Sequence, residues 1–130
     1  MKKIALPLFF ACALLLSNIA DSHMVTVNSV EEYYQHYNGN TPMITLYAAE
    51  WCPPCKQIKP HFYAAAKAAD DITFCVIDID ASAFAPILSQ ISGVPTIIYS
   101  HKGKPVTRTV GGKNRQSLDT AIQSFRNMVR

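Results

Sequence analysis

Two cysteines, Cys52 and Cys55, stand in the segment AEWCPPCK with only two prolines between them. Cysteines at this spacing can ligate a metal ion, form a structural disulfide, or exchange disulfides with another molecule. The prolines also remove two backbone N–H groups beside the first sulfur. The rest of the sequence must distinguish these three kinds of site.

A zinc site would need further ligands at suitable spacing. Structural zinc takes four ligands, commonly a second CxxC or two closely spaced histidines. The four histidines of this chain are scattered. His61 follows Cys55 by six residues, which places it about 240° around a helix. The sequence therefore predicts no metal at the cysteine pair.

This spacing also argues against a purely structural disulfide. Closing so short a loop removes little conformational entropy from the unfolded chain, so the bridge stabilises the fold less than one across a long loop. Cys75 stands alone in the apolar segment TFCVI, where we expect a small buried hydrophobe rather than a third redox group. Disulfide exchange is left as the favoured chemistry.

The position of the pair supports that chemistry. Residues 43–49 are apolar almost throughout, as in a strand covered on both faces, and residues 53–69 carry the apolar stripe of a helix. Cys52 then lies at the helix N-terminus, where the dipole and free N–H groups stabilise a thiolate. Cys55 shares the buried stripe. We predict that Cys52 attacks a substrate disulfide and that Cys55 resolves the mixed disulfide.

The remaining segments place this strand and helix in an α/β fold. Further strands are expected at residues 24–27, 72–79, 93–100 and 105–110, and further helices at 29–37, 83–91 and from 114 onward. Their alternation predicts a central mixed β-sheet flanked by helices on both faces. The cysteine pair follows a central strand, where open α/β sheets place their functional sites.

The first 22 residues differ from the rest and predict a signal peptide. A basic start is followed by an apolar run over residues 4–16 and a small, polar stretch over residues 17–22. The run is shorter than a spanning helix, and Pro7 interrupts it, which disfavours the alternative of a retained membrane anchor. Cleavage near residues 20–22 would leave a domain at residues 23–130 in a periplasmic or secreted, disulfide-permissive location.

Charge and length limit the partners. The chain has 130 residues, enough for one domain, and a formal net charge of +3 without a basic run. The even charge distribution argues against nucleic acid as the main partner.

Several motifs together resemble the thioredoxin family. AEWCPPCK is similar to its active-site stretch, and Pro60 matches the proline inside its active-site helix. GVPT, at residues 93–96, resembles the loop that carries a cis proline. KGK followed by VGG matches the hairpin and the glycine after it, Gly111. The resemblance covers about residues 24–129 and implies a thioredoxin fold and thiol–disulfide oxidoreductase activity, with the disulfide as redox centre and no other cofactor.

The resemblance also implies how protein thiols and disulfides dock as substrates. We expect Pro95 in the cis form, exposing the backbone of Val94 so that a substrate peptide can pair with it as an extra strand. An ordinary trans proline at the start of an edge strand is the alternative. Trp51 is expected to shape the apolar surface beside the nucleophile, and Gly111 to give close access on the neighbouring loop.

The chain departs from the family pattern behind the cysteines. Many thioredoxins carry a buried Asp six residues before the first cysteine and a Lys near it, and these positions are Leu46 and Val76 here. Glu50 is the carboxylate nearest in sequence and a candidate for proton transfer. The alternative is that Glu50 is a solvated loop residue.

The two prolines bear on the direction of electron flow. Neither Pro53 nor Pro54 can donate an N–H to the Cys52 thiolate, and no histidine between the cysteines adds charge. Weaker thiolate stabilisation makes a less oxidising couple. We therefore expect a monomeric periplasmic reductant, recharged by a membrane thiol reductant of the DsbD type. The alternatives are a disulfide oxidase or isomerase, or a redox-inactive binding or chaperone module.

Overall fold

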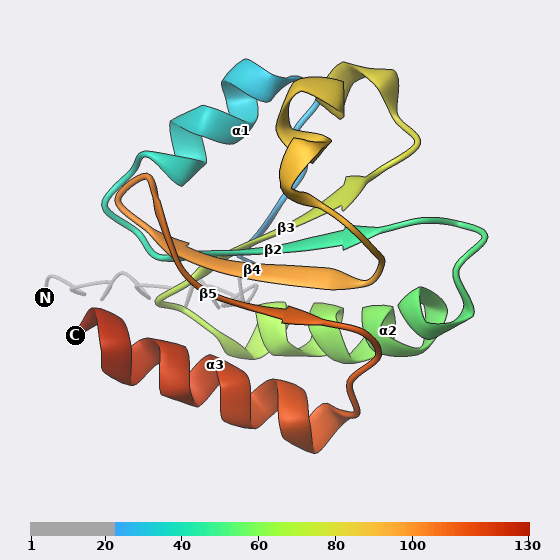
Figure 1. Ribbon diagram of the computed structural model, residues 1–130. Helices are drawn as coiled ribbons and strands as arrows, with labels where there is room; N and C mark the ends of the chain where they lie inside the picture. Colours follow the sequence, from blue (N-terminus) through green and yellow to red (C-terminus); the bar gives the residue numbers. More distant parts are fainter. Residues whose placement is uncertain (1–22) are drawn as a thin grey trace, which may run out of the picture.

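The computed structural model describes residues 23–130, so the predicted signal peptide lies outside the described residues. Five strands form one mixed sheet in the order β1-β3-β2-β4-β5 (Figure 1). These strands are β1 (Met24–Val25), β2 (Met43–Ala48), β3 (Thr73–Asp78), β4 (Thr96–His101) and β5 (Lys104–Val110). The pairs β1–β3 and β3–β2 are parallel, whereas β4 runs antiparallel to both β2 and β5. The predicted mixed sheet is confirmed.

Helices cover both faces of this sheet, as predicted. They are α1 (Val30–Tyr37), α2 (Pro53–Ala68), the 3₁₀ helix η1 (Ser82–Gln90) and α3 (Arg115–Val129). Helices α2 and α3 lie side by side on one face, and α1 and η1 lie on the other (Figure 1). Among residues 23–130, no helix has the length and hydropathy that a bilayer-spanning segment requires.

Two of the differences from the sequence prediction are explained by proline. The segment expected as an α-helix at residues 83–91 is the 3₁₀ helix η1, which contains Pro86. A proline inside a helix removes an N–H donor and crowds the preceding turn. The strand expected from residue 93 begins only at Thr96, because Pro95 has no N–H for the ladder.

Strand β2 lies at the centre of the sheet, between β3 and β4. All six of its residues are buried. Residues before and after such a strand must leave the sheet at its ends, and β2 ends at Ala48, four residues before Cys52. The loop from β2 to α2, the loop before β4 and the loop from β5 to α3 all lie at the right-hand end of the molecule (Figure 1).

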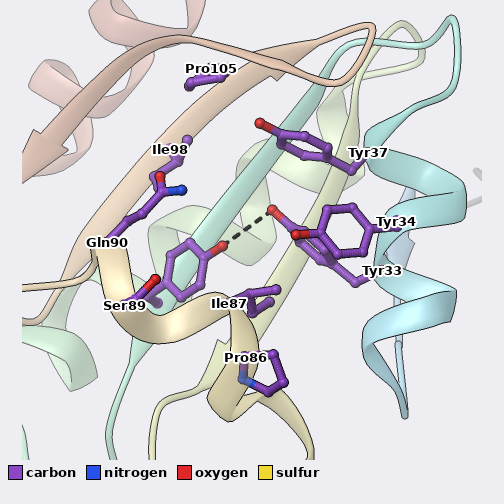
Figure 2. A pocket seen from close by; sticks show the side chains of 10 residues that line it. Tyr33, Tyr34, Tyr37, Pro86, Ile87, Ser89, Gln90, Ile98 and Pro105 are labelled. Carbon is purple, nitrogen blue, oxygen red and sulfur yellow. Dashed lines mark hydrogen bonds between the residues drawn. The ribbon is translucent and has the colours of Figure 1, made fainter.

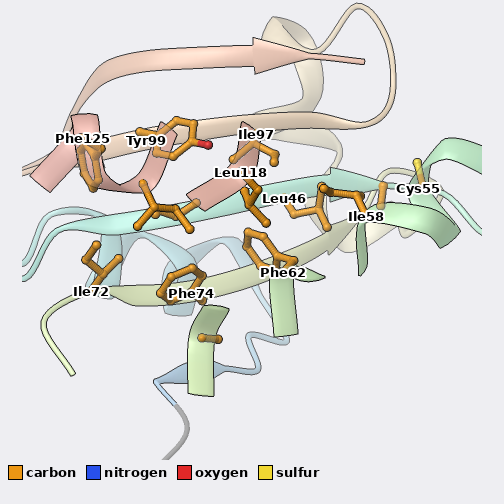
Figure 3. Close-up of a cluster of buried hydrophobic side chains, with 14 of the residues drawn as sticks. Leu46, Cys55, Ile58, Phe62, Ile72, Phe74, Ile97, Tyr99, Leu118 and Phe125 are labelled. Carbon is orange, nitrogen blue, oxygen red and sulfur yellow. The ribbon is translucent and has the colours of Figure 1, made fainter. Parts of the chain in front are cut away.

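The main core lies between the sheet and helices α2 and α3 (Figure 3). Its largest fully buried side chains include Phe62 of α2, Tyr99 of β4 and Phe125 of α3. The Phe62 ring meets that of Phe74 edge-on at a centroid distance of 5.3 Å. Burial of this apolar surface holds α2 firmly on the sheet and so fixes where the helix begins.

A second cluster of buried residues occupies the opposite face, under α1 and η1. It borders a small hollow of about 80 Å³ that is lined by tyrosines and prolines (Figure 2). The hydroxyls of Tyr33 and Tyr47 lie 3.2 Å apart and share a hydrogen bond. Burial raises the pKa of both tyrosines, so the hydroxyls stay protonated and satisfy each other.

Cys75 belongs to this second cluster and forms no disulfide. It lies fully buried in β3, as predicted for a small hydrophobe. Burial raises the pKa of the Cys75 thiol to about 12. The thiolate, which is the nucleophile, is therefore scarce at neutral pH.

Cys75 should resist alkylation in the native protein. A thiol with a pKa of about 12 is ionised to about one part in ten thousand at pH 8, and the fraction rises only as the pH approaches that pKa. In a variant with Cys52→Ser and Cys55→Ser, iodoacetamide at pH 8 should give no adduct within residues 23–130, as followed by mass spectrometry. The same variant in urea should gain one adduct there. Native modification at the rate of an unfolded cysteine would contradict this prediction.

Candidate functional site

The site is built where β2 leads into α2. Cys52 is the N-cap of α2 and has an extended backbone, with φ −99° and ψ 106°. Pro53 and Pro54 follow at the first helical positions, where the N–H would have no intrahelical partner in any case. The sequence therefore starts the helix directly after the first cysteine, as predicted.

Cys52 and Cys55 form a disulfide, with their Cα atoms 5.3 Å apart. The Sγ of Cys52 accepts a hydrogen bond of 3.2 Å from the backbone N–H of Cys55. This is the donor that the proline pair leaves available at the helix start. Both cysteines belong to the main core cluster, and Figure 3 shows Cys55 beside Ile58 at one end of that core. The disulfide thus closes the core at the carboxyl end of β2.

The wall behind the disulfide is apolar. Leu46 is fully buried in β2, paired in register with Val76 on β3 and with Ile97 on β4. Within residues 23–130, no carboxylate forms a hydrogen bond with Cys55. The departure from the family pattern at Leu46 and Val76 therefore leaves hydrocarbon where a buried acid–base pair would otherwise stand.

Glu50 lies on the solvent side of the site. Its side chain is 83% exposed, and its Oε1 lies 3.5 Å from the Nζ of Lys59. In the described part of the chain, no hydrogen bond joins the Glu50 carboxylate to Cys52 or Cys55. A role for Glu50 in proton transfer stays a prediction.

The loop before β4 meets the loop after β5. The Val94–Pro95 peptide bond is cis, as predicted. The N–H of Gly111 donates to the carbonyl of Pro95 at 2.9 Å, and Gly111 has a φ of +90°, which favours glycine. Val94 packs against the core cluster that contains both cysteines. The structure therefore brings Val94, Pro95 and Gly111 to the same end of the core as the disulfide.

Trp51 has a partner that the sequence reasoning missed. The indole is 65% exposed, and its Nε1 donates to Oδ2 of Asp80 at 2.8 Å. Asp80 follows β3, the parallel neighbour of β2, so its side chain reaches the same edge of the sheet. Polar residues after adjacent parallel strands were the signal that could have found it. The hydrogen bond orients an exposed ring beside the nucleophile.

These contacts leave one reactive group, the sulfur pair. Residues 23–130 contain no cluster of three or more metal-ligating His, Cys, Asp or Glu side chains. Two close sulfurs at a helix start, both buried and one of them in the N-cap, can accept or donate two electrons by thiol–disulfide exchange. A role for Trp51, Val94, Pro95 and Gly111 in docking a substrate chain stays a prediction.

Comparison with known proteins gives the same assignment. The sequence profile of the thioredoxin family matches residues 24–124. The chain is 36% identical to a thioredoxin of Chlamydia trachomatis over 95 residues, which cover 73% of this chain and 92% of that protein. It is 34% identical to thioredoxin-2 of Saccharomyces cerevisiae over 103 residues, which cover 78% and 98% of the two chains.

The fold agrees as well. The crystal structure of Malassezia sympodialis thioredoxin superposes with a TM-score of 0.68 at 27% identity, covering 76% of this chain and 87% of that one. The predicted thioredoxin fold is confirmed, and so is the family resemblance first suggested by the motifs. The chain belongs to the thioredoxin family of thiol–disulfide oxidoreductases, with Cys52 and Cys55 as its redox-active pair.

Proposed function

We propose that the protein is an exported reductant of protein disulfides, working as a monomer in the periplasm after residues 1–22 are removed. The observation that carries the direction is the bonding of the Cys52 sulfur. Its hydrogen bond within residues 23–130 comes from one neutral donor, the N–H of Cys55 at 3.2 Å. Strong disulfide oxidants owe their potential to a well-stabilised thiolate, and a single neutral N–H offers modest stabilisation.

A substrate chain docks beside the sulfurs as an added strand. Its backbone pairs with the backbone of Val94, and the loop at Gly111 allows close approach from the other side. The exposed ring of Trp51, held by Asp80, covers apolar side chains of the substrate. This arrangement selects extended segments that surround a disulfide rather than one particular sequence.

The reaction transfers two electrons in two exchange steps. The Cys52 thiolate attacks one sulfur of the substrate disulfide, the substrate S–S bond breaks, and the released thiolate takes a proton from solvent. The Cys55 thiol then loses its proton and attacks Sγ of Cys52, which releases the second substrate thiol. The substrate disulfide is reduced to two thiols, and the protein is oxidised to the Cys52–Cys55 disulfide.

The second step needs a group that accepts the proton of Cys55. The apolar wall formed by Leu46, Val76 and Ile97 offers none. We propose that a base from solvent accepts this proton, because the Glu50 carboxylate is exposed and lies beside Lys59. Resolution is then slower than attack, since burial in apolar surroundings disfavours the thiolate of Cys55.

An exported reductant must regain two electrons after every turnover. The periplasm is oxidising, so we propose that a membrane thiol reductant of the DsbD type returns them. Removal of the basic residues Lys2 and Lys3 with the leader would leave a nearly neutral domain. A disulfide oxidase or isomerase and a redox-inactive binding module are the alternatives that the following experiments separate.

Substitution of each cysteine should separate the two steps. Cys52→Ser should abolish the protein's acceleration of insulin reduction by dithiothreitol, because the attacking sulfur is gone. Cys55→Ala should still attack and should accumulate mixed disulfides with substrate proteins, visible on non-reducing gels. Cys75→Ala is the matched control and should keep wild-type activity. Unchanged insulin reduction in Cys52→Ser would favour a redox-inactive binding module.

The reduction potential should identify the direction. Equilibration with glutathione buffers should give a value between about −270 and −180 mV, the range of reducing and intermediate proteins. The physical reason is the modest stabilisation of the Cys52 thiolate by one neutral donor. A value near the roughly −120 mV of a DsbA-type oxidase would contradict the proposal and favour a disulfide oxidase.

The rate of resolution should depend on buffer base at constant pH. A preformed mixed disulfide at Cys52 should be released faster as the buffer concentration rises, because solvent base takes the Cys55 proton. Glu50→Gln should leave this rate within about twofold of wild type, with Lys59→Gln as the control for the lost ion pair. A rate that is independent of buffer and falls in Glu50→Gln would instead assign proton transfer to Glu50.

A further inference from the structure

An open groove lined by four polar and two small or apolar residues continues from the disulfide toward the start of α3. It has a volume of about 580 Å³ and lies between the first half of α2 and the loop that follows β5. Its lining comprises Pro54, Gln57, His61, Gly112, Lys113 and Asn114. The reaction described above uses none of the polar side chains in this set.

The groove is directly joined to the redox site. Pro54 lies between the two cysteines, and a Cβ placed on Gly112 would lie only 3.4 Å from the Cβ of Pro54. Gly111, the preceding residue, donates its N–H to Pro95 at 2.9 Å. A substrate segment held at Pro95 can therefore extend past Gly112 into the groove.

The α2 side of the groove presents polar groups without partners. Pro54, Gln57 and His61 fall at positions i, i+3 and i+7, so they share one face of the helix next to the buried stripe. The side chains of Gln57 and His61 form no hydrogen bond or ion pair within residues 23–130. His61 is half-buried, which keeps its ring at the groove.

Lys113 gives the groove a positive charge. Its side chain is half-buried, and its ammonium has no carboxylate within 4 Å among the described residues. No Asp or Glu belongs to the lining. The adjacent Asn114 is uncharged, and its side chain already caps α3 by accepting from the N–H of Ser117 at 2.8 Å. The positive charge of the groove is therefore assigned to Lys113.

The opposite flank of the disulfide is different. Asp80 accepts from the indole of Trp51, and Glu50 lies 3.5 Å from Lys59, so these two carboxylates already have partners. A substrate that crosses the site therefore meets an aromatic ring on one flank and an unpaired cation with two free polar side chains on the other. Charge complementarity favours an anion in the second position.

We propose that this groove is a specificity subsite for an acidic side chain of the substrate segment that carries the disulfide. Lys113 pairs with the substrate carboxylate, and Gln57 and His61 hydrogen-bond to it. The subsite rests on the proposed function only in that the substrate is a disulfide-bearing protein segment. It applies whichever way the electrons flow.

Matched peptides test the subsite. Each of three peptides has one internal disulfide, and they are identical except at the position two residues from one cysteine, which is Glu, Gln or Lys. A second set of three carries the same changes at the position two residues from that cysteine on its other side. The dithiol protein should reduce the Glu peptide of one set about fivefold more efficiently than the Lys peptide in kcat/KM, as expected for a partly exposed ion pair. In about 1 M salt this preference should largely disappear.

Variants at Lys113 assign the preference. Lys113→Glu should reverse the order of the Glu and Lys peptides, and Lys113→Gln should remove the preference without reversing it. Lys67→Glu makes the same charge change on an exposed residue in the last turn of α2 and should keep the wild-type order. If Lys67→Glu changed the order of the Glu and Lys peptides as much as Lys113→Glu does, the preference would follow net charge alone, and the subsite would be overturned.

A small neutral disulfide distinguishes this proposal from the one it rests on. Wild type, Lys113→Glu and Lys113→Gln should all reduce 2-hydroxyethyl disulfide at similar rates, which also shows that the variants are folded. Equal rates for all peptides together with normal reduction of the small disulfide would overturn the acidic subsite alone. If the wild-type protein reduced neither the peptides nor 2-hydroxyethyl disulfide, the proposed function would be overturned.

Discussion

The packing of α2 against the centre of the sheet positions the rest of the site. Its apolar stripe, which contains Cys55, Ile58 and Phe62, packs in the main core, where Phe62 meets Phe74 of β3, and the helix begins after β2 has ended. Both sulfurs are thereby held at the edge of the core, Cys52 at the helix N-cap and Cys55 one turn further along the helix. Loosening this contact would move both sulfurs relative to the loops that carry Pro95 and Gly111, because those loops are held at the same end of the sheet.

That packing also decides how protons reach the sulfurs. Leu46 completes the apolar surface behind Cys55 and improves the burial that anchors α2. The same side chain removes any acid or base from the interior of the site. Stability of the helix contact and speed of deprotonation at Cys55 therefore oppose each other at one position. The second cluster, under α1 and η1, lies on the other face of the sheet and does not include Leu46.

The chemistry was predictable because it depends on neighbours in sequence. The N-cap position of Cys52, the inward direction of Cys55 and the lack of N–H donors at Pro53 and Pro54 follow from local helix geometry. The sheet and its two helical layers followed from hydrophobic periodicity. The cis form of Pro95 was expected from the family resemblance, because spacing alone would have favoured trans.

Contacts between distant segments were not predictable in this way. The hydrogen bond from Trp51 to Asp80 joins residues 29 positions apart in the sequence. The close approach of Gly112 to Pro54 depends on how α3 packs beside α2. Neither contact leaves a periodic pattern in the sequence. The 3₁₀ form of η1 depends on one proline whose effect varies with its place in a helix.

The two prolines have a further consequence once the disulfide is opened. Each proline ring holds its backbone φ near −65°, so the dithiol form has few ways to separate its sulfurs. Cys55 then faces a mixed disulfide at Cys52 at a high effective concentration, as in a well-oriented intramolecular reaction. A small thiol in solution competes poorly with such a neighbour. The two rigid prolines thus favour attack on the mixed disulfide by Cys55 over attack by other thiols, even though they offer the sulfur of Cys52 no hydrogen bond.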